Sequence, residues 1–335
     1  MKAAAERPIY SVYLISNGNK YDVTPALTGL DFSDQKNQMA QSATVRLMNI
    51  RVGTGWLAGM MRVRDRVFIY ADDGSRKDEV FRGFIWSRSY ESSLDEREIS
   101  LKCYDNLIYW QESQDAEYFS PGKSTKDILS ALCSKWGVTL EYSYASITHS
   151  KLALRGNLAD LVTDDILDLV KDRTGKKYVI LSRKDVVQIK PVGSNGTIYR
   201  FLAGQNAVRT NSECTMDGMI TKVIILGKAD DNDRQPVEAT ISGNTGAYGT
   251  LQKVINRSSN TALADAKKEA QSILKENGAP KWEYELTAPD IPWIRKGDKV
   301  YVNAGDIYDS YLIVTSLDRS IRGSSSKMTL TMDKP

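Results

Sequence analysis

Residues 63–70 have the sequence VRDRVFIY, and residues 295–302 have the similar sequence RKGDKVYV. The segments that follow also correspond, with VFRGFIW (80–86) and EISLKC (98–103) after the first and YLIV (311–314) and KMTLTM (327–332) after the second. Each copy is typical of three short strands, rich in β-branched and aromatic residues and separated by polar turns. Chance resemblance between two meanders is the alternative, but the shared opening and matched spacing favour a small β-barrel that occurs twice.

The residues before the first copy are also typical of strands. Residues 9–15 (IYSVYLI) precede an Asn17-Gly18 pair, which indicates a hairpin, and residues 43–48 (ATVRLM) alternate apolar and polar side chains. With the strands up to Tyr104, about a hundred residues supply six or seven strands, which are enough to close into a barrel.

The hydrophobic period becomes helical between Tyr104 and Tyr199. Residues 124–127 (STKD) predict a helix N-cap, and Gly137 predicts the end of that helix. Residues 163–165 (TDD) repeat the cap signal before a second helix that ends at Gly175, and strands are expected at 138–142, 178–181 and 186–189. This region therefore predicts a compact α+β module of two helix–strand units.

The chain returns to strands after residue 198. A Gly-rich stretch at 242–249 and a helix expected from Asn260 to Gly278 interrupt the second barrel before the second copy of the repeat. We therefore predict an α+β, mainly β chain with two similar antiparallel β-barrels. The expected domains are a first barrel at 1–110, an α+β insert at 111–198 and a second barrel at 199–335, interrupted at about 242–280.

Composition and charge limit the classes of function. The 335 residues are 41% hydrophobic and 26% charged, as in an ordinary globular protein, and the net charge of +3 is not gathered into a basic patch. The sequence therefore does not predict tight binding of duplex DNA. Three scattered cysteines (Cys103, Cys133 and Cys214) fit neither a disulfide framework nor a zinc site, and they indicate folding in a reducing compartment.

The sequence predicts neither secretion nor membrane insertion. Residues 1–8 (MKAAAERP) carry charges and a proline where a signal peptide has an apolar run, and no segment approaches the roughly 20 apolar residues of a membrane span. We therefore expect a protein that is made in the cytoplasm and stays soluble there.

Residues with catalytic or metal-binding chemistry are few. His149, the single histidine, lies in a polar loop and is expected to be a solvated surface residue rather than part of a triad. Asp164 and Asp165 resemble paired general acids, but the first turn of a helix favours carboxylates for electrostatic reasons alone. Residues 230–233 (DDND) lack the glycine and glutamate of a calcium-binding loop. No catalytic, metal-binding or cofactor-binding residue is assigned.

Two further features leave an alternative open. Residues 243–249 (GNTGAYG) contain glycines but no lysine of a phosphate-binding loop, and they are expected to form a mobile connection. Most aromatic residues fall at core positions, but Trp56, Trp110 and Trp293 allow an oligosaccharide-binding site. A carbohydrate- or peptidoglycan-binding barrel protein is therefore the alternative interpretation.

The order of these segments resembles the baseplate hub proteins of contractile phage tails. The resemblance covers a first barrel, an insert that begins with residues 124–129 (STKDIL), and a second barrel in which a helix with Ala262, Ala266 and Ala270 precedes residues 294–300 (IRKGDKV). The chain is similar to late control protein D-like hubs and to the hubs of phage-like elements and tail-like bacteriocins of Gram-positive bacteria.

The resemblance implies a structural protein with no cofactor or catalytic residue. It implies a homotrimer that joins a six-fold tail tube, or a tube-initiator protein, to a three-fold spike and contacts other baseplate proteins. DNA would then be only passing cargo if the particle is a phage, and the protein would be assembled in the bacterial cytoplasm into a tail baseplate without contact with a membrane. The repeated strands place four candidate subunit-interface residues at Val67, Ile69, Val300 and Val302.

Overall fold

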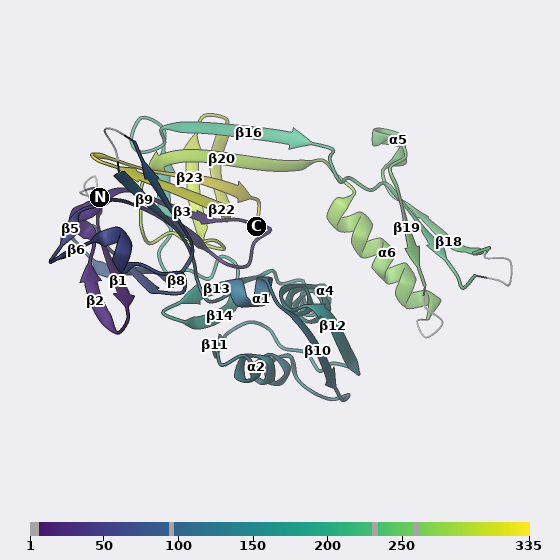
Figure 1. Cartoon of the computed structure of the whole chain (residues 1–335). Helices are drawn as coiled ribbons and strands as arrows, with labels where there is room; N and C mark the ends of the chain where they lie inside the picture. Colours follow the sequence, from purple (N-terminus) through teal and green to yellow (C-terminus); the bar gives the residue numbers. More distant parts are fainter. Residues whose placement is uncertain (1–6, 94–96, 230–233, 258–261) are drawn as a thin grey trace. The chain divides into compact units, whose positions relative to one another are not determined.

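The structure, a computed structural model, describes residues 7–93, 97–229, 234–257 and 262–335. The chain divides into two compact units, one formed by residues 1–211 and 284–335 and the other by residues 212–283 (Figure 1). The larger unit holds most of a large β-sheet and the insert. No helix in the described ranges is long and apolar enough to span a bilayer.

Seven strands from the first hundred residues form the first half of the large sheet. They are β1 (Ile9–Ser16), β2 (Asn19–Asp22), β3 (Leu27–Asp34), β4 (Ser42–Met48), β7 (Arg66–Asp72), β8 (Lys77–Ser92) and β9 (Arg97–Tyr104). Hydrogen bonds join them in the order β3-β4-β9-β8-β7-β1-β2, with every pair antiparallel. The predicted hairpin is confirmed between β1 and β2, where Asn17 (φ 49°) and Gly18 (φ 77°) are left-handed.

Six later strands form the second half. They are β15 (Tyr199–Leu202), β16 (Arg209–Thr215), β20 (Lys281–Pro289), β21 (Lys299–Ala304), β22 (Ile307–Arg322) and β23 (Ser325–Asp333). Their order in the sheet is β16-β20-β23-β22-β21-β15. Strand by strand this order matches β3-β4-β9-β8-β7-β1. The strands β7, β8 and β9 follow one another along the chain, and so do their counterparts β21, β22 and β23. The last pair differs in direction, because β15 runs parallel to β21 whereas β1 runs antiparallel to β7.

The long strands of the two halves match in length and irregularity. Both β8 and β22 contain 16 residues. Each has a β-bulge against the strand that follows it, between Ile85 and Ser87 in β8 and between Val314 and Ser316 in β22. A bulge bends its strand and increases the local twist. The two copies of the predicted three-strand element therefore share a bend as well as an order.

The turn that opens the first copy is held by hydrogen bonds within the turn and to β8. The Asp65 carboxylate accepts one from the backbone N–H of Arg62 at 2.7 Å. The backbone N–H of Arg64 donates to the carbonyl of Ile85 at 2.6 Å, and the N–H of Ile85 donates to the carbonyl of Asp65 at 2.9 Å. The turn is thereby fixed to the middle of β8.

The turn that opens the second copy has the same bonds. The Asp298 carboxylate accepts from the N–H of Arg295 at 2.9 Å. Gly297 donates to the carbonyl of Val314 at 2.7 Å, and Val314 donates to Asp298 at 2.9 Å. The third residue is left-handed in both turns, with φ 72° at Arg64 and 84° at Gly297, a conformation that a non-glycine residue adopts only under local constraint. This agreement confirms the predicted repeat.

The two halves are joined into one sheet rather than closed separately. β22 pairs antiparallel with β3, from Leu317 opposite Asp34 to Arg322 opposite Gly29. This ladder makes a continuous sheet of 13 strands. Between the described residues no ladder closes either half, so the prediction of two closed barrels is not confirmed. The physical reason is that the edge of β3 is occupied by the other half.

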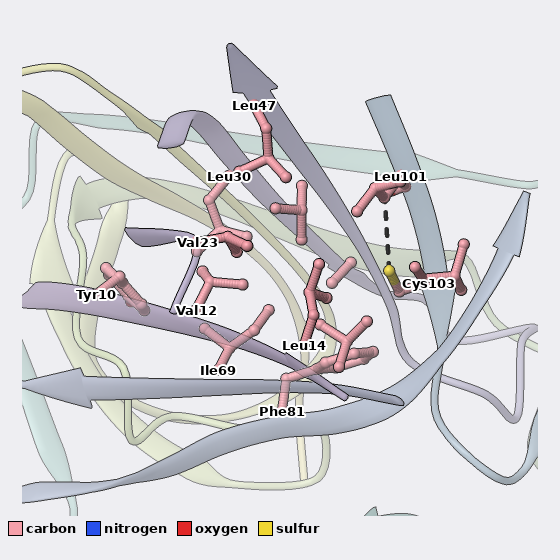
Figure 2. Close-up of a cluster of buried hydrophobic side chains, with 14 of the residues drawn as sticks. Tyr10, Val12, Leu14, Val23, Leu30, Leu47, Ile69, Phe81, Leu101 and Cys103 are labelled. Atoms are coloured by element: carbon pink, nitrogen blue, oxygen red, sulfur yellow. Dashed lines mark hydrogen bonds between the residues drawn. The ribbon is translucent and has the colours of Figure 1, made fainter. Parts of the chain in front are cut away.

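Each half has its own hydrophobic core. Alternate side chains of the strands point inward, and Figure 2 shows Val12, Leu14, Ile69 and Phe81 meeting in the first half. The buried core of the second half is built the same way, from residues that include Phe201, Leu286, Val300, Leu312 and Leu330. The sheet is flanked in the first half by short elements, namely η1 (Thr24–Ala26), β5 (Arg51–Val52), β6 (Gly55–Trp56) and η2 (Leu57–Met60).

The insert follows β9 and has a third core. Its helices are α1 (Ile108–Gln111), α2 (Thr125–Lys135), α3 (Leu158–Asp160), the π-helical η3 (Leu161–Leu167) and α4 (Asp168–Thr174). Its strands are β10 (Gln114–Phe119), β11 (Thr139–Tyr142), β12 (Leu152–Asn157), β13 (Tyr178–Arg183) and β14 (Val186–Pro191). They form two small sheets, β10-β12 and β11-β14-β13. The predicted cap of α2 is confirmed, since Ser124 and Asp127 form a reciprocal capping box.

The second helix of the insert begins earlier than predicted. Asn157 caps it by accepting hydrogen bonds from the N–H groups of Ala159 and Asp160, and α3, η3 and α4 follow one another without a break. Asp164 and Asp165 therefore lie in a π-helical stretch inside the helix, and their predicted role as caps is wrong. The predicted end is confirmed at Gly175, which is left-handed with φ 68°.

The smaller unit holds a three-stranded sheet and one long helix. Its elements are β17 (Lys222–Leu226), β18 (Val237–Ser242), α5 (Thr245–Tyr248), β19 (Gln252–Asn256) and α6 (Leu263–Asn277). The strand order is β18-β17-β19, and Ala266 and Ala270 of α6 pack on Val223 and Ile225 of β17. This buried face of α6 agrees with the predicted helix, whereas its predicted cap at 260–261 lies outside the described residues.

Candidate functional site at the junction of the two halves

The four candidate interface residues lie inside the cores. Val67 and Ile69 point into the core of the first half, and Val300 and Val302 into that of the second, each with 0% of its surface exposed. The backbones of β7 and β21 are also paired on both sides. A contact of these strands with another subunit would therefore use the side chains that alternate with the four valine and isoleucine residues.

The residues considered for catalysis do not form a site. His149 is 3% exposed and shares a hydrogen bond of 2.8 Å with the hydroxyl of Thr125, so the prediction of a solvated histidine is wrong. Burial, with a contribution from the charge of Arg173, lowers its pKa. Asp164 and Asp165 lie on a different element, and residues 230–233 lie outside the described ranges. Within the described residues no three His, Cys, Asp or Glu side chains are placed to hold a metal ion.

The glycine-rich stretch and the tryptophans are also accounted for locally. Residues 243–249 contain the short helix α5 where a mobile connection was predicted. Trp110 is 1% exposed in the core of the insert, Trp56 lies beside the Arg51 guanidinium, and the indole N–H of Trp293 donates to the Asp73 carboxylate at 2.6 Å. Each tryptophan thus has a separate structural environment.

Buried charges lie where the two halves meet. The Arg319 guanidinium of β22 donates to the Asp290 carboxylate at 2.9 Å, and both side chains are almost completely buried. Arg319 also donates to the carbonyls of Ile291 (3.0 Å) and Ile294 (2.5 Å). The Tyr10 hydroxyl of β1 donates to the same Asp290 carboxylate. This cluster connects the first strand of one half to the loop that precedes β21 in the other.

A second buried cluster crosses the same junction. The Lys296 ammonium forms an ion pair of 2.8 Å with Asp34 and donates to the carbonyls of Gln35 (3.0 Å) and Gln38 (2.7 Å). Lys296 belongs to the opening turn of the second half, and the other groups lie at the end of β3 in the first. Buried ion pairs hold geometry more than they add stability, because desolvation offsets much of the attraction. The cluster thus fixes the register of the joint.

A shallow polar hollow of about 420 Å³ lies over the joint, lined by residues of β3, β4, β9, β20, β22 and β23. Asp31 is the central charged group of this surface, since it pairs with Arg322 across the joint at 2.6 Å and with Arg46 of β4. Burial works to raise the pKa of Asp31, but the hydrogen bonds from Arg322 and Arg46 outweigh it and hold the pKa below its usual value. Asp31 is therefore held as a carboxylate by its two arginine partners.

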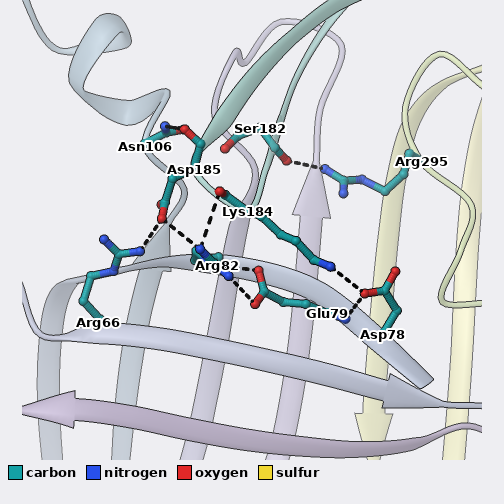
Figure 3. A network of polar contacts seen from close by, with 9 residues as sticks. All are labelled: Arg66, Asp78, Glu79, Arg82, Asn106, Ser182, Lys184, Asp185 and Arg295. Atoms are coloured by element: carbon teal, nitrogen blue, oxygen red, sulfur yellow. Dashed lines mark hydrogen bonds and ion pairs between the residues drawn. The ribbon is translucent and has the colours of Figure 1, made fainter. Parts of the chain in front are cut away.

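The insert is attached to the first half by charged groups. Figure 3 shows the tip of the β13–β14 hairpin against β7 and β8, where Asp185 pairs with Arg66 at 2.5 Å and with Arg82 at 3.2 Å. Arg82 in turn binds both oxygens of Glu79 at 2.8 Å. Lys184 pairs with Asp78 at 2.9 Å. Because these charged groups act together, they position the hairpin more firmly than an isolated surface pair would.

These ionic clusters were not predicted from the sequence. One signal was available, because Arg319 interrupts the alternation of apolar residues in β22 at a position that the pattern assigns to the core. A charged residue at a core position indicates a buried partner. The partner itself could not be deduced, since Asp290 precedes Arg319 by 29 residues and Tyr10 precedes Asp290 by 280.

The fold has counterparts of known structure. A family model described as YQBQ-like matches residues 31–333. The tail protein from Neisseria meningitidis has a TM-score of 0.71 at 14% identity, covering 97% of this chain and 96% of that one. The 43 kDa tail protein of prophage MuSo2 from Shewanella oneidensis has a TM-score of 0.70 at 14% identity, covering 97% and 98%.

A more distant counterpart comes from a secretion system. A type VI secretion system component of E. coli has a TM-score of 0.56 at 8% identity and covers 92% of this chain and 74% of that one. Its description reports structural similarity to the T4 bacteriophage tail proteins gp27 and gp5. No curated protein matches the chain in sequence. The chain thus shares its fold with proteins of phage tails and related particles.

Proposed function

Because the chain belongs to the YQBQ-like family and has the fold of phage tail proteins, we propose that it is the structural baseplate hub of a contractile tail or tail-like particle. Three copies form a trimer that joins the six-fold tail tube, or a tube-initiator protein, to the three-fold spike. Other baseplate proteins surround it, and DNA passes it only if the particle is a phage. This role needs no catalytic group.

The observation that carries the proposal is the repeated strand order within one chain. Two similar halves per chain give a trimer six similar units, so three copies can match a six-fold partner on one face. The insert and the smaller unit occur once per chain, and any face that bears them keeps three-fold symmetry. Cyclic assembly closes such a ring without leaving unsatisfied contacts.

The proposal gives each part of the chain a role. In the division at 1–110, 111–198 and 199–335, the first and last parts carry the tube-facing sheets and the insert belongs to the spike-facing side. The ionic network of Asp185, Arg66 and Arg82 supports this division of labour, because it holds the insert in one position on the first half. A rigid connection is needed to align two partners of different symmetry.

The mass of the assembly tests the proposal. We expect light scattering to give three times the chain mass of 37.4 kDa for the protein alone, or this mass plus that of the bound partners after addition of the tube and spike proteins. A stable monomer at high concentration in the presence of both partners would contradict the proposal. Substitution of His149 to Ala, or of Asp164 and Asp165 to Asn, is expected to leave the assembly intact, whereas lost particle activity with intact assembly would favour an enzyme.

A further inference from the structure

The same strand position is covered in one half and exposed in the other. Ile85 of β8 and Val314 of β22 are equivalent, because each bonds to the opening turn of its own half. Counting from these residues, 88–92 of β8 correspond to 317–321 of β22. In β22 this segment pairs with β3, and Leu317, Arg319 and Ile321 are buried. In β8 every residue from 86 to 92 is exposed.

The exposed segment of β8 has one edge without a strand partner. Its ladder with β9 continues to Ser92, whereas its ladder with β7 ends at Phe84. Among the described residues, no other strand pairs with β8 beyond that point. The corresponding edge of β22 is the one that β3 occupies. An unpaired edge of this length is a template for another strand.

Among the described residues, the counterpart of β3 also has a strand neighbour on one side alone. In the matched strand orders, β16 takes the position of β3. β16 lies at the end of the sheet, and β20 is its strand neighbour among the described residues. The first half therefore exposes the equivalent of β22, and the second half exposes the equivalent of β3. Within the chain, β22 of the second half pairs with β3 of the first half. The two exposed edges therefore belong to the counterparts of the two strands that form this ladder.

The chemistry of the two edges is compatible with pairing. Tyr90 on β8 is 45% exposed and Val208, beside the start of β16, is 65% exposed, and burial of such side chains is favourable. Arg88 of β8 donates to the carbonyls of Ala58 and Met61, as Arg319 of β22 does to the loop before β21. The Arg319 contacts do not prevent β3 from pairing with β22. The equivalent Arg88 contacts are therefore compatible with a strand that pairs with the edge of β8.

We propose that a second copy of this chain occupies the free edge of β8. The outer edge of β16, near residues 208–211, pairs antiparallel with residues 88–92 of the next copy and reproduces the β22–β3 ladder between chains. The contact is head-to-tail, and where three copies close on themselves it gives a ring in which joints within and between chains alternate. This inference rests on the proposed function, because it names the subunit contact of the hub trimer.

Chemical cross-linking tests this contact. In a Cys214→Ser background, the remaining cysteines Cys103 and Cys133 are buried. The double variant Tyr90→Cys/Asn211→Cys, treated with a short bis-maleimide, is expected to give covalent dimers and trimers. Either single variant is expected to give none, because a head-to-tail contact does not bring two copies of one residue together. Tyr118→Cys combined with Asn211→Cys is the control, since Tyr118 is 59% exposed on β10 of the insert.

Each outcome decides between the two proposals. A trimer by light scattering without cross-links in the double variant overturns the β8–β16 contact and leaves the hub in place. A chain that stays monomeric in the presence of its tube and spike partners overturns both the hub trimer and the β8–β16 contact. Cross-links in either single variant would show a two-fold contact between copies, which excludes the β8–β16 contact. Hydrogen exchange of the unmodified chain adds a test without substitutions. The amides in residues 88–92 that point away from β9 should exchange at least tenfold more slowly in the oligomer than in the dilute monomer.

Discussion

Asp105, directly after β9, is a buried carboxyl group whose protonation affects stability. Its oxygens accept hydrogen bonds from the N–H groups of Leu107 (3.0 Å) and Gln41 (3.2 Å). Burial, together with the nearby negative charge of Asp34, raises its pKa to about 7. Between about pH 4 and pH 7 the folded chain therefore keeps a proton that the unfolded chain has lost. Its contribution lowers the free energy of unfolding as the pH rises through this range and is constant above about pH 7.

The substitution Asp105→Asn removes this titration. We expect the free energy of unfolding of the variant to depend less on pH, by up to about 1.4 kcal/mol per pH unit between pH 4 and 7. Urea unfolding at a series of pH values measures the difference. The matched control is Asp265→Asn on α6, where the carboxylate is 63% exposed and the parent pH dependence should remain. An Asp105→Asn variant with the parent slope would show that Asp105 is ionised in the folded chain.

The Arg319–Asp290 pair gives a prediction about the junction. Arg319→Met leaves the Asp290 carboxylate buried without its cation, and we expect a loss of about 3–5 kcal/mol in the free energy of unfolding. Adding Asp290→Asn should recover part of this loss, because the uncompensated charge is then gone. Chemical denaturation of both variants measures it. The control Lys268→Met breaks an exposed pair with Asp265 and should leave the midpoint unchanged. If the losses in the free energy of unfolding from the two substitutions simply added in the double variant, Arg319 and Asp290 would not be a coupled pair.

Individual residues show where sequence reasoning was limited. His149 lies among polar residues in the sequence, so a surface position was expected, but its ring is buried against Thr125. The neighbours of a residue along the chain do not reveal which distant element covers it. The caps at Ser124 and Gly137 were predictable, because such signals depend on a few adjacent residues.

At the scale of elements, Gly83 permits the close approach of β8 to β9. A Cβ atom at this position would lie 2.1 Å from the carbonyl oxygen of Tyr104, which is a backbone atom and cannot move aside alone. We expect Gly83→Ala to lower the free energy of unfolding by about 1–3 kcal/mol or more, because the two strands would have to separate. Thermal unfolding measures the change.

The matched control is Gly59→Ala in η2. A Cβ there would have no atom within 4 Å, so the control should unfold near the parent temperature. If Gly83→Ala were as stable as the control, β8 and β9 would be less closely packed beside Gly83 than this distance to Tyr104 indicates.

Elements with strong local signals were predicted and the others were not. The three-strand repeats, the hairpin at Asn17-Gly18 and the helix after Ser124 each have a periodic pattern and a defined turn. The strands β10 and β12 were missed, and the helix after β12 was consequently placed too late. Asn157, followed three residues later by Asp160, is the local capping signal that marks where this helix begins.

At the scale of the whole molecule, the repeat was predictable but the connection of its copies was not. The ladder between β22 and β3 joins residues such as Leu317 and Asp34, which are far apart in the sequence, and their local patterns do not specify this pairing. Two separate barrels were expected because each half contains enough strands to close. Among the described residues, β8 beyond Phe84 and the outer edge of β16 instead lack a strand neighbour on one side, and such edges are templates for pairing with another strand.

The symmetry of the assembled ring distinguishes a trimer of duplicated chains from a ring of six chains. Averaged electron-microscopic images of the assembly, viewed along its axis, should show three chains that form six similar sheet units around one channel, with three-fold features from the parts that occur once per chain. Image classes with six chains, or with the two halves of each chain at unlike distances from the axis, would rule out a trimer in which the two halves are equivalent.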